Sequence, residues 1–164
     1  MAGSKKLRLL QVGVVHYKST PSFGFFGMPG GDSIVVYSDG SIIQRKYVFG
    51  QEEPSAEDKV AFMPEVAVLI EKVLISHKED IKKISSKLNN RTLDGSHNCF
   101  QFGKKKISSW SIKRTDLSEV EQRNPKYYRE YKDNMIQENM VIDIYNEIVD
   151  IINAFDLGLE LKKK

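Results

Sequence analysis

A single carboxylate interrupts an apolar stripe in the last third of the chain. Large apolar residues recur at alternating three- and four-residue steps: Tyr128, Tyr131, Met135, Ile142, Tyr145, Val149 and Ile152. Glu138 stands where this spacing requires another apolar residue. A buried carboxylate is costly without a partner, so Glu138 needs either a bonding group or a water-filled cleft. Two hypotheses follow: a functional carboxylate in a cleft near His16 or His97, or a structural carboxylate bonded within the core.

A segment rich in glycine and phenylalanine is the second candidate. Residues 19–32 contain four glycines, two prolines and three phenylalanines. Glycine lets a ligand or partner approach the backbone closely, and large apolar side chains supply contact area. We therefore predict a ligand- or partner-binding loop with these contact residues: Phe23, Phe25, Phe26 and Met28. The alternative is a wide connection whose phenylalanines plug one end of the core.

Three consecutive lysines form a candidate basic patch: Lys104, Lys105 and Lys106. Aromatic residues flank them on two alternating segments, and such a combination can stack bases while neutralising phosphates. Alternation, however, predicts that Phe100, Phe102 and Trp110 face the core. Because the net charge of the chain is only +3, nucleic-acid binding is the less favoured interpretation.

The other residue types that often carry chemistry form no constellation. The three histidines (His16, His77 and His97) lack the spacing of metal ligands. No serine has the Gly-x-Ser-x-Gly context of a hydrolase nucleophile. Cys99, on an alternating segment, is expected to be a small core residue. We therefore predict no metal site and no cofactor.

Composition predicts one folded domain over residues 1–164, with disordered basic ends at 1–6 and 160–164. Of the 164 residues, 40% are hydrophobic and 29% charged, close to globular averages. No run of about 18 apolar residues could span a membrane, and the N-terminal segment lacks a signal-peptide cleavage site. A lone cysteine cannot form an intrachain disulfide and fits a reducing compartment. These features predict a cytoplasmic protein.

The order of expected elements indicates an α+β fold. Residues 7–17 alternate as a strand, and residues 33–49 form a hairpin around Asp39-Gly40, a dipeptide typical of type I′ turns. Residues 98–114 form a second hairpin. We predict an antiparallel sheet built from the N-terminal strand and these two hairpins.

Helices are expected to pack against this sheet. Ser55 and Asp58 approximate a capping box for a helical region over 55–88, in which Pro64 starts a fresh helix and 79–88 forms a last helical stretch. A long C-terminal helix is expected over 125–155, with Asn124 as its cap and Pro125 as its first residue.

Charge is unevenly distributed and suggests a partner. Residues 98–132 carry nine Lys and Arg against four acids, whereas 133–161 carry seven acids and no Lys or Arg. An acidic helix with an apolar rim could dock a basic protein surface. The leading hypothesis is a non-enzymatic protein-binding module of inhibitor, immunity or adaptor type. The alternatives are a small ligand-binding protein or hydrolase with Glu138 in a cleft, and a nucleic-acid-binding protein that uses the 98–114 hairpin.

Overall fold

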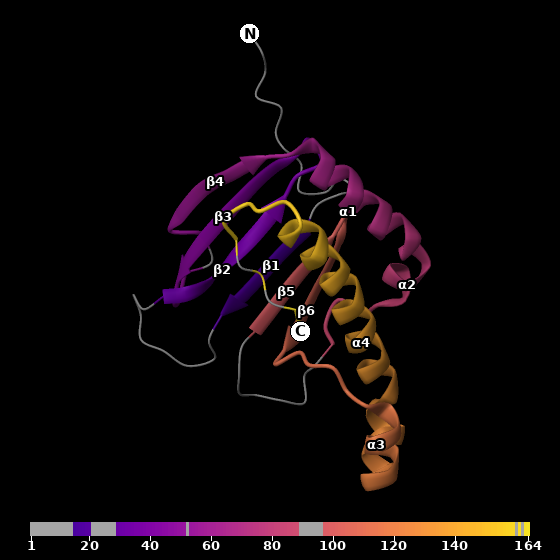
Figure 1. Ribbon diagram of the computed structural model, residues 1–164. Coiled ribbons are helices and arrows are strands. Elements are labelled where there is room, and N and C mark those ends of the chain that lie inside the picture. Colours follow the sequence, from indigo (N-terminus) through magenta and orange to yellow (C-terminus); the bar gives the residue numbers. More distant parts are fainter. Residues whose placement is uncertain (1–14, 21–28, 52, 89–96, 160, 162) are drawn as a thin grey trace.

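The computed structural model describes residues 15–20, 29–51, 53–88, 97–159, 161 and 163–164. Its strands form one six-stranded antiparallel sheet in the order β4-β3-β2-β1-β5-β6 (Figure 1). They are β1 (Val15–Thr20), β2 (Pro29–Val36), β3 (Ser41–Val48), β4 (Ala56–Phe62), β5 (His97–Phe102) and β6 (Lys105–Trp110). The helices are α1 (Pro64–Ser76), α2 (Lys78–Lys83), α3 (Leu117–Arg123) and α4 (Pro125–Asn153). The predicted α+β class with two hairpins and a long C-terminal helix is confirmed.

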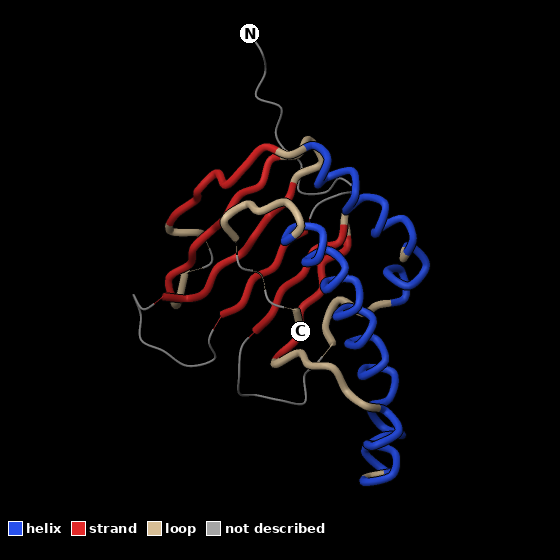
Figure 2. Tube along the Cα trace, in the orientation of Figure 1, coloured by secondary structure: helices blue, strands red, loops and turns tan. Residues whose placement is uncertain are grey.

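The helices lie on one side of the sheet (Figure 2), and the core fills the space between the two layers. Ile34 and Val36 of β2 belong to the main cluster with residues of α1 and α4. Val35 and Tyr37 form a second, small cluster. Because successive strand residues point to opposite faces, this separation shows that both faces of β2 are buried.

The first hairpin is confirmed, but its turn is not of type I′. Gly40 has a φ of 100°, whereas Asp39 has no positive φ. The Tyr37 carbonyl accepts from Gly40 N, and Tyr37 N donates to the Ser41 carbonyl, as in a type I turn followed by a glycine bulge. The Asp39 carboxylate accepts from Ser41 N at 2.9 Å. That bond keeps Asp39 in the ordinary backbone region, so one positive φ suffices.

The predicted helical region over 55–88 is wrong at its start, because Ala56–Phe62 is a strand. Ser55 does not cap a helix. Its backbone N–H and its hydroxyl both donate to the Lys46 carbonyl and so close the turn between β3 and β4. Strand β4 is charged and largely exposed at the sheet edge, where charged side chains discourage pairing with other chains. Pro64 begins α1 as predicted.

The helical stretch expected over 79–88 is also corrected. Helix α2 ends at Lys83, and Ile84 has an extended backbone. Ser86 and Leu88 then hydrogen bond through their backbones to Ser108 of β6. Ile84 and Leu88 are nevertheless buried, so this segment contributes to the core without continuing the helix.

The second hairpin spans residues 97–110, whereas the predicted range was 98–114. Phe102 pairs with Lys105, and Gly103, with a φ of 63°, leads the two-residue turn. Strand β6 ends at Trp110, whose register partner is His97.

Trp110 is wrongly placed by the prediction. Phe100 and Phe102 face the main core, whereas Trp110 belongs to the other set of alternating positions and is half-buried. Cys99 is likewise half-buried, on the face opposite Phe100, which corrects its expected core position.

The long helix begins as expected. The Asn124 side chain accepts from Tyr127 N at 3.1 Å and Pro125 is the first helical residue. The apolar stripe is buried from Met135 to Ile152, with Glu138 among its members. Helix α3 was not predicted. Asp116 caps it by accepting from Glu119 N.

Candidate functional site

The outward side of α1 carries apolar side chains that a water-facing helix would normally lack. Among the described residues, the exposed large hydrophobic side chains are Phe62 (55% exposed), Val68 (50%), Leu69 (37%), Ile75 (59%) and Ile136 (39%). All except Ile136 belong to α1 or lie two residues before it. We call these four residues the α1 apolar patch. The side of α1 that faces the core is formed by Val66, Ala67, Ile70 and Leu74.

Helical geometry explains how α1 presents apolar residues on two sides. Val68 and Ile75 are seven residues apart, so they share one side of the helix. Val66 and Ile70 are buried on the side that packs against the sheet and α4. Exposed apolar side chains concentrated in one part of a folded chain often mark a contact site.

A hollow adjoins the C-terminal end of this patch. It has a volume of about 400 Å³ and lies between the α1–α2 region and the β5–β6 turn. Its lining is Leu74, Ile75, Lys78, Ile81, Lys82, Phe102, Gly103, Lys104 and Lys105. We call it the lysine-rimmed groove. Two of the three predicted patch lysines, Lys104 and Lys105, therefore join lysines of α2 around an apolar floor, while Lys106 lies on β6 outside this lining.

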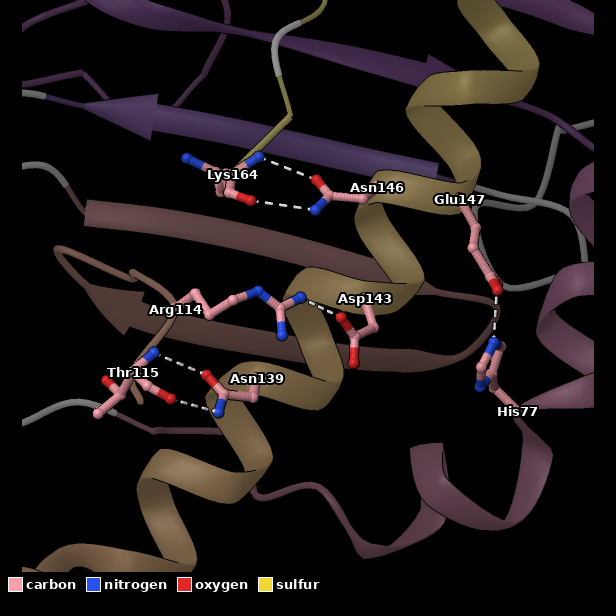
Figure 3. A network of polar contacts seen from close by, with 8 residues as sticks. All are labelled: His77, Arg114, Thr115, Asn139, Asp143, Asn146, Glu147 and Lys164. Carbon is pink, nitrogen blue, oxygen red and sulfur yellow. Dashed lines mark hydrogen bonds and ion pairs between the residues drawn. The ribbon is translucent and has the colours of Figure 1, made fainter. Parts of the chain in front are cut away.

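Several carboxylates of the acidic helix contact basic side chains or histidine in the same chain (Figure 3). Asp143 pairs with Arg114, Glu147 with His77 at 2.7 Å, and Asp150 with Lys163 at 2.8 Å. Glu138 is buried. The described carboxylates of 133–161 therefore present less charge to a partner than the sequence suggests.

Three asparagine side chains on α4 hydrogen bond to backbone atoms of other segments of the chain. Asn139 accepts from Thr115 N and donates to the Thr115 carbonyl, both at 2.9 Å. Asn146 makes the same pair of bonds with Lys164, at 2.9 and 3.0 Å (Figure 3). Asn153 donates to the Leu161 carbonyl at 3.0 Å. These asparagines are spaced seven residues apart, so they follow one side of α4.

The described part of the C-terminal tail, residues 157–159, 161 and 163–164, also contacts the core. Leu157, Leu159 and Leu161 pack against the main cluster, and Lys164 Nζ lies 3.5 Å from Asn98 Oδ1. Residues 1–6, for which disorder was predicted, lie outside the described part of the chain. Residues 160 and 162 lie outside it as well.

Glu138 is 2% exposed, so the predicted break in the apolar stripe is a buried position. Its flanking stripe residues Met135 and Ile142 are equally buried. Glu138 lines neither the lysine-rimmed groove nor the second hollow described below. A role for Glu138 in catalysis stays a prediction.

A second hollow, of about 450 Å³, lies where β6 leads into α3 and α4. Several of its charged side chains are engaged locally. Arg123 pairs with Glu119 at 2.9 Å, and Asp116 accepts from the Ser118 hydroxyl at 2.8 Å. The hydrogen bonds from the Ser118 hydroxyl and from Glu119 N lower the pKa of Asp116 below its ordinary value. This hollow is therefore built chiefly by the capping of α3.

A small polar cluster occupies the sheet near β4. Arg45 Nη2 donates to the Tyr37 hydroxyl at 2.9 Å, and Arg45 Nε lies 2.7 Å from Glu57. Burial raises the pKa of Tyr37, although the Arg45 charge acts in the opposite direction. The cluster fastens the edge strand β4 to the sheet.

The remaining predicted site residues lie outside the described part of the chain. These are the loop residues Phe23, Phe25, Phe26 and Met28. The side chains of His16 and His97 are not described either. Among the described residues, no group of three or more His, Cys, Asp or Glu side chains could hold a metal ion.

Comparison of the chain with protein-family models, with curated proteins and with solved structures gave no match. The described helices include none that is both long and apolar enough to cross a membrane.

Sequence reasoning missed two features of these surfaces. The seven-residue spacing of Asn139, Asn146 and Asn153 is visible in the sequence and could have predicted a polar side of α4. The lysine-rimmed groove had no comparable signal, because its lysines come from segments more than twenty residues apart.

Proposed function

We propose that this protein is a non-enzymatic protein-binding module, of inhibitor, immunity or adaptor type, that contacts its partner through the α1 apolar patch. The observation that carries the proposal is the concentration of exposed large hydrophobic side chains on and just before α1. Fully burying such a side chain contributes about 1.5–3 kcal/mol. Since these four are roughly half exposed, covering them would contribute about 3–6 kcal/mol to a complex.

The test is recovery of a stoichiometric partner from cells that naturally express the protein, after crosslinking. We expect the double substitution Val68→Asp and Leu69→Asp to abolish recovery, because it places charge where the partner buries apolar surface. Lys126→Asp, at an exposed position near the start of α4, makes the same change in net charge outside α1; it is the matched control and should retain the partner. The proposal fails if no partner is recovered, or if recovery is the same for the double variant.

Contact between a basic partner and the acidic helix, residues 133–161, stays a second prediction. Asp133 and Asp156 are exposed and could contribute, whereas Asp143 and Asp150 form ion pairs and Glu147 hydrogen bonds to His77. The described surface therefore gives this contact weaker support than the α1 apolar patch.

Binding of nucleic acid through the second hairpin also has little support. Stacking of bases requires exposed aromatic faces, and Phe100 and Phe102 are only 1% and 3% exposed. The hydrolase alternative depends on Glu138, which is 2% exposed and lines neither of the two hollows described above.

A further inference from the structure

The lysine-rimmed groove combines an apolar floor with a basic rim. Leu74 and Phe102 lie at its base and are almost fully buried, while Ile75 stands at its edge, 59% exposed. Lys78, Lys82 and Lys104 are exposed around it, and Lys105 is half-buried. A molecule that fills the groove must therefore offer an apolar group surrounded by negative charge.

The rim charges are largely available to a partner. Lys82 lies 3.5 Å from Glu79, one turn away on α2. None of Lys78, Lys104 and Lys105 has an ion-pair partner among the described residues. Lysines that converge on one hollow raise the local positive potential, which attracts and orients an acidic partner.

From this charge complementarity we infer that the groove binds an acidic segment of a partner protein, in which a large apolar side chain enters the hollow and Asp or Glu residues contact the lysines. This inference rests on the proposed function, and it adds the chemistry of the partner. The partner's contact would continue from the α1 apolar patch, because Ile75 belongs to both surfaces.

Two other anionic occupants fit the groove less well. Single-stranded nucleic acid would need exposed aromatic rings for stacking, and the only ring in the lining, Phe102, is 3% exposed. A membrane surface is contacted by apolar side chains that protrude. A hollow of about 400 Å³ instead receives a side chain from its partner, as the pockets of protein interfaces do.

The test begins with the selection of peptides from a random displayed library on the whole chain. The affinity of individual selected peptides is then measured by fluorescence anisotropy. We expect the selected peptides to combine Asp and Glu with a large apolar residue. The double variant Lys78→Glu and Lys104→Glu should weaken their binding by roughly tenfold or more, and so should Ile75→Ser, a change at an exposed position that the fold tolerates.

The matched control reverses the same number of charges elsewhere. Lys126 and Lys132 are exposed on the first turns of α4, and Lys126→Glu with Lys132→Glu should change affinity by no more than roughly threefold. Equal losses in both double variants would overturn the inference, because they would indicate an effect of net charge alone. Selected peptides without acidic residues would overturn it too.

Further outcomes separate this inference from the proposed function. If selected peptides bind the Lys78 and Lys104 variant normally but lose affinity for the Val68 and Leu69 variant, the groove is excluded while the α1 apolar patch stands. If no peptide is selected, the inference about the groove is rejected, while the proposed function is still judged by recovery of the partner from cells. Retention on duplex DNA, or on vesicles of phosphatidylglycerol, that disappears in the lysine variant while peptides fail to bind would assign the groove to that anion instead.

Discussion

Replacement of Gly40 by alanine tests how the first hairpin is joined to α1. Gly40 has a φ of 100°, in the region that side chains with a Cβ rarely adopt. A Cβ at this position would lie 2.5 Å from Pro64 N, 2.7 Å from Pro64 Cα and 2.8 Å from the Met63 carbonyl carbon. These are backbone atoms at the start of α1, so no side-chain rotation can relieve the overlap. Gly40 O also accepts from Met63 N at 2.8 Å.

The expected cost has two parts. The positive φ contributes about 1–2 kcal/mol once a Cβ is present, and forced displacement in a packed region contributes about 1–3 kcal/mol. Gly40→Ala should therefore lower the free energy of unfolding by about 2–5 kcal/mol. This is a large share of the roughly 5–15 kcal/mol that stabilises a typical domain.

Gly158 supplies the matched control. It has a φ of 71°, but a Cβ there would meet nothing within 4 Å, so Gly158→Ala should cost only the backbone contribution of about 1–2 kcal/mol. Guanidinium denaturation followed by circular dichroism measures both variants, and an unchanged m-value shows that stability alone was altered. Equal losses for the two variants would refute the idea that contact with α1 makes Gly40 necessary.

Three further predictions concern polar groups. Asn146→Ala should lower the free energy of unfolding by about 1–3 kcal/mol and speed carboxypeptidase digestion of the C-terminal tail; unchanged digestion would contradict this. Since burial raises the pKa of Tyr37, its contribution to stability is lost as pH rises through that pKa. Tyr37→Phe, despite losing the bond from Arg45, should therefore show a shallower fall in melting temperature above about pH 10, and parallel curves would argue against it. Glu138→Ala should cost about 2–4 kcal/mol against less than about 0.5 kcal/mol for the exposed Asp133→Ala, and similar values would show that the Glu138 side chain is dispensable to the core.

Apolar periodicity predicted the elements that pack against one another. Alternation in β2 separates Ile34 from Val35 onto opposite faces, and the three- and four-residue steps of α4 locate its buried side from Met135 to Ile152. These signals are local consequences of strand and helix geometry, so they can be read without knowledge of the partner element. The same holds for the cap at Asn124.

Elements fixed by pairing with distant segments could not be predicted in this way. Ser55 followed by Asp58 resembles a helix cap, yet the Ser55 hydroxyl bonds to the Lys46 carbonyl because β3 offers β4 a free edge. Ile84 and Leu88 have helical spacing, yet Leu88 bonds to Ser108 of β6. In both places the backbone bonds to a neighbouring strand, and the competing short helix would carry the unfavourable cost of nucleation.

The candidate site also combines features that local sequence signals predict with features that depend on distant segments. Lys104 and Glu138 attract attention in the sequence because each departs from its surroundings, but their exposure depends on the fold. The fold buries Glu138 and brings Lys104 beside lysines of α2. No local pattern in the sequence predicts that Lys104 lies beside the lysines of α2.

The distribution of polar bonds explains why α1, and not the acidic helix, is the stronger candidate for partner binding. Helix α4 directs its carboxylates and asparagines to segments of its own chain, including Arg114, His77 and Lys164. A partner that competed for those groups would first have to break these contacts. Among the described residues, the α1 apolar patch and three of the rim lysines, Lys78, Lys104 and Lys105, have no such contacts to break. Affinity gained at α1 therefore adds to the stability of the fold, whereas affinity gained at α4 would be offset by bonds lost within it.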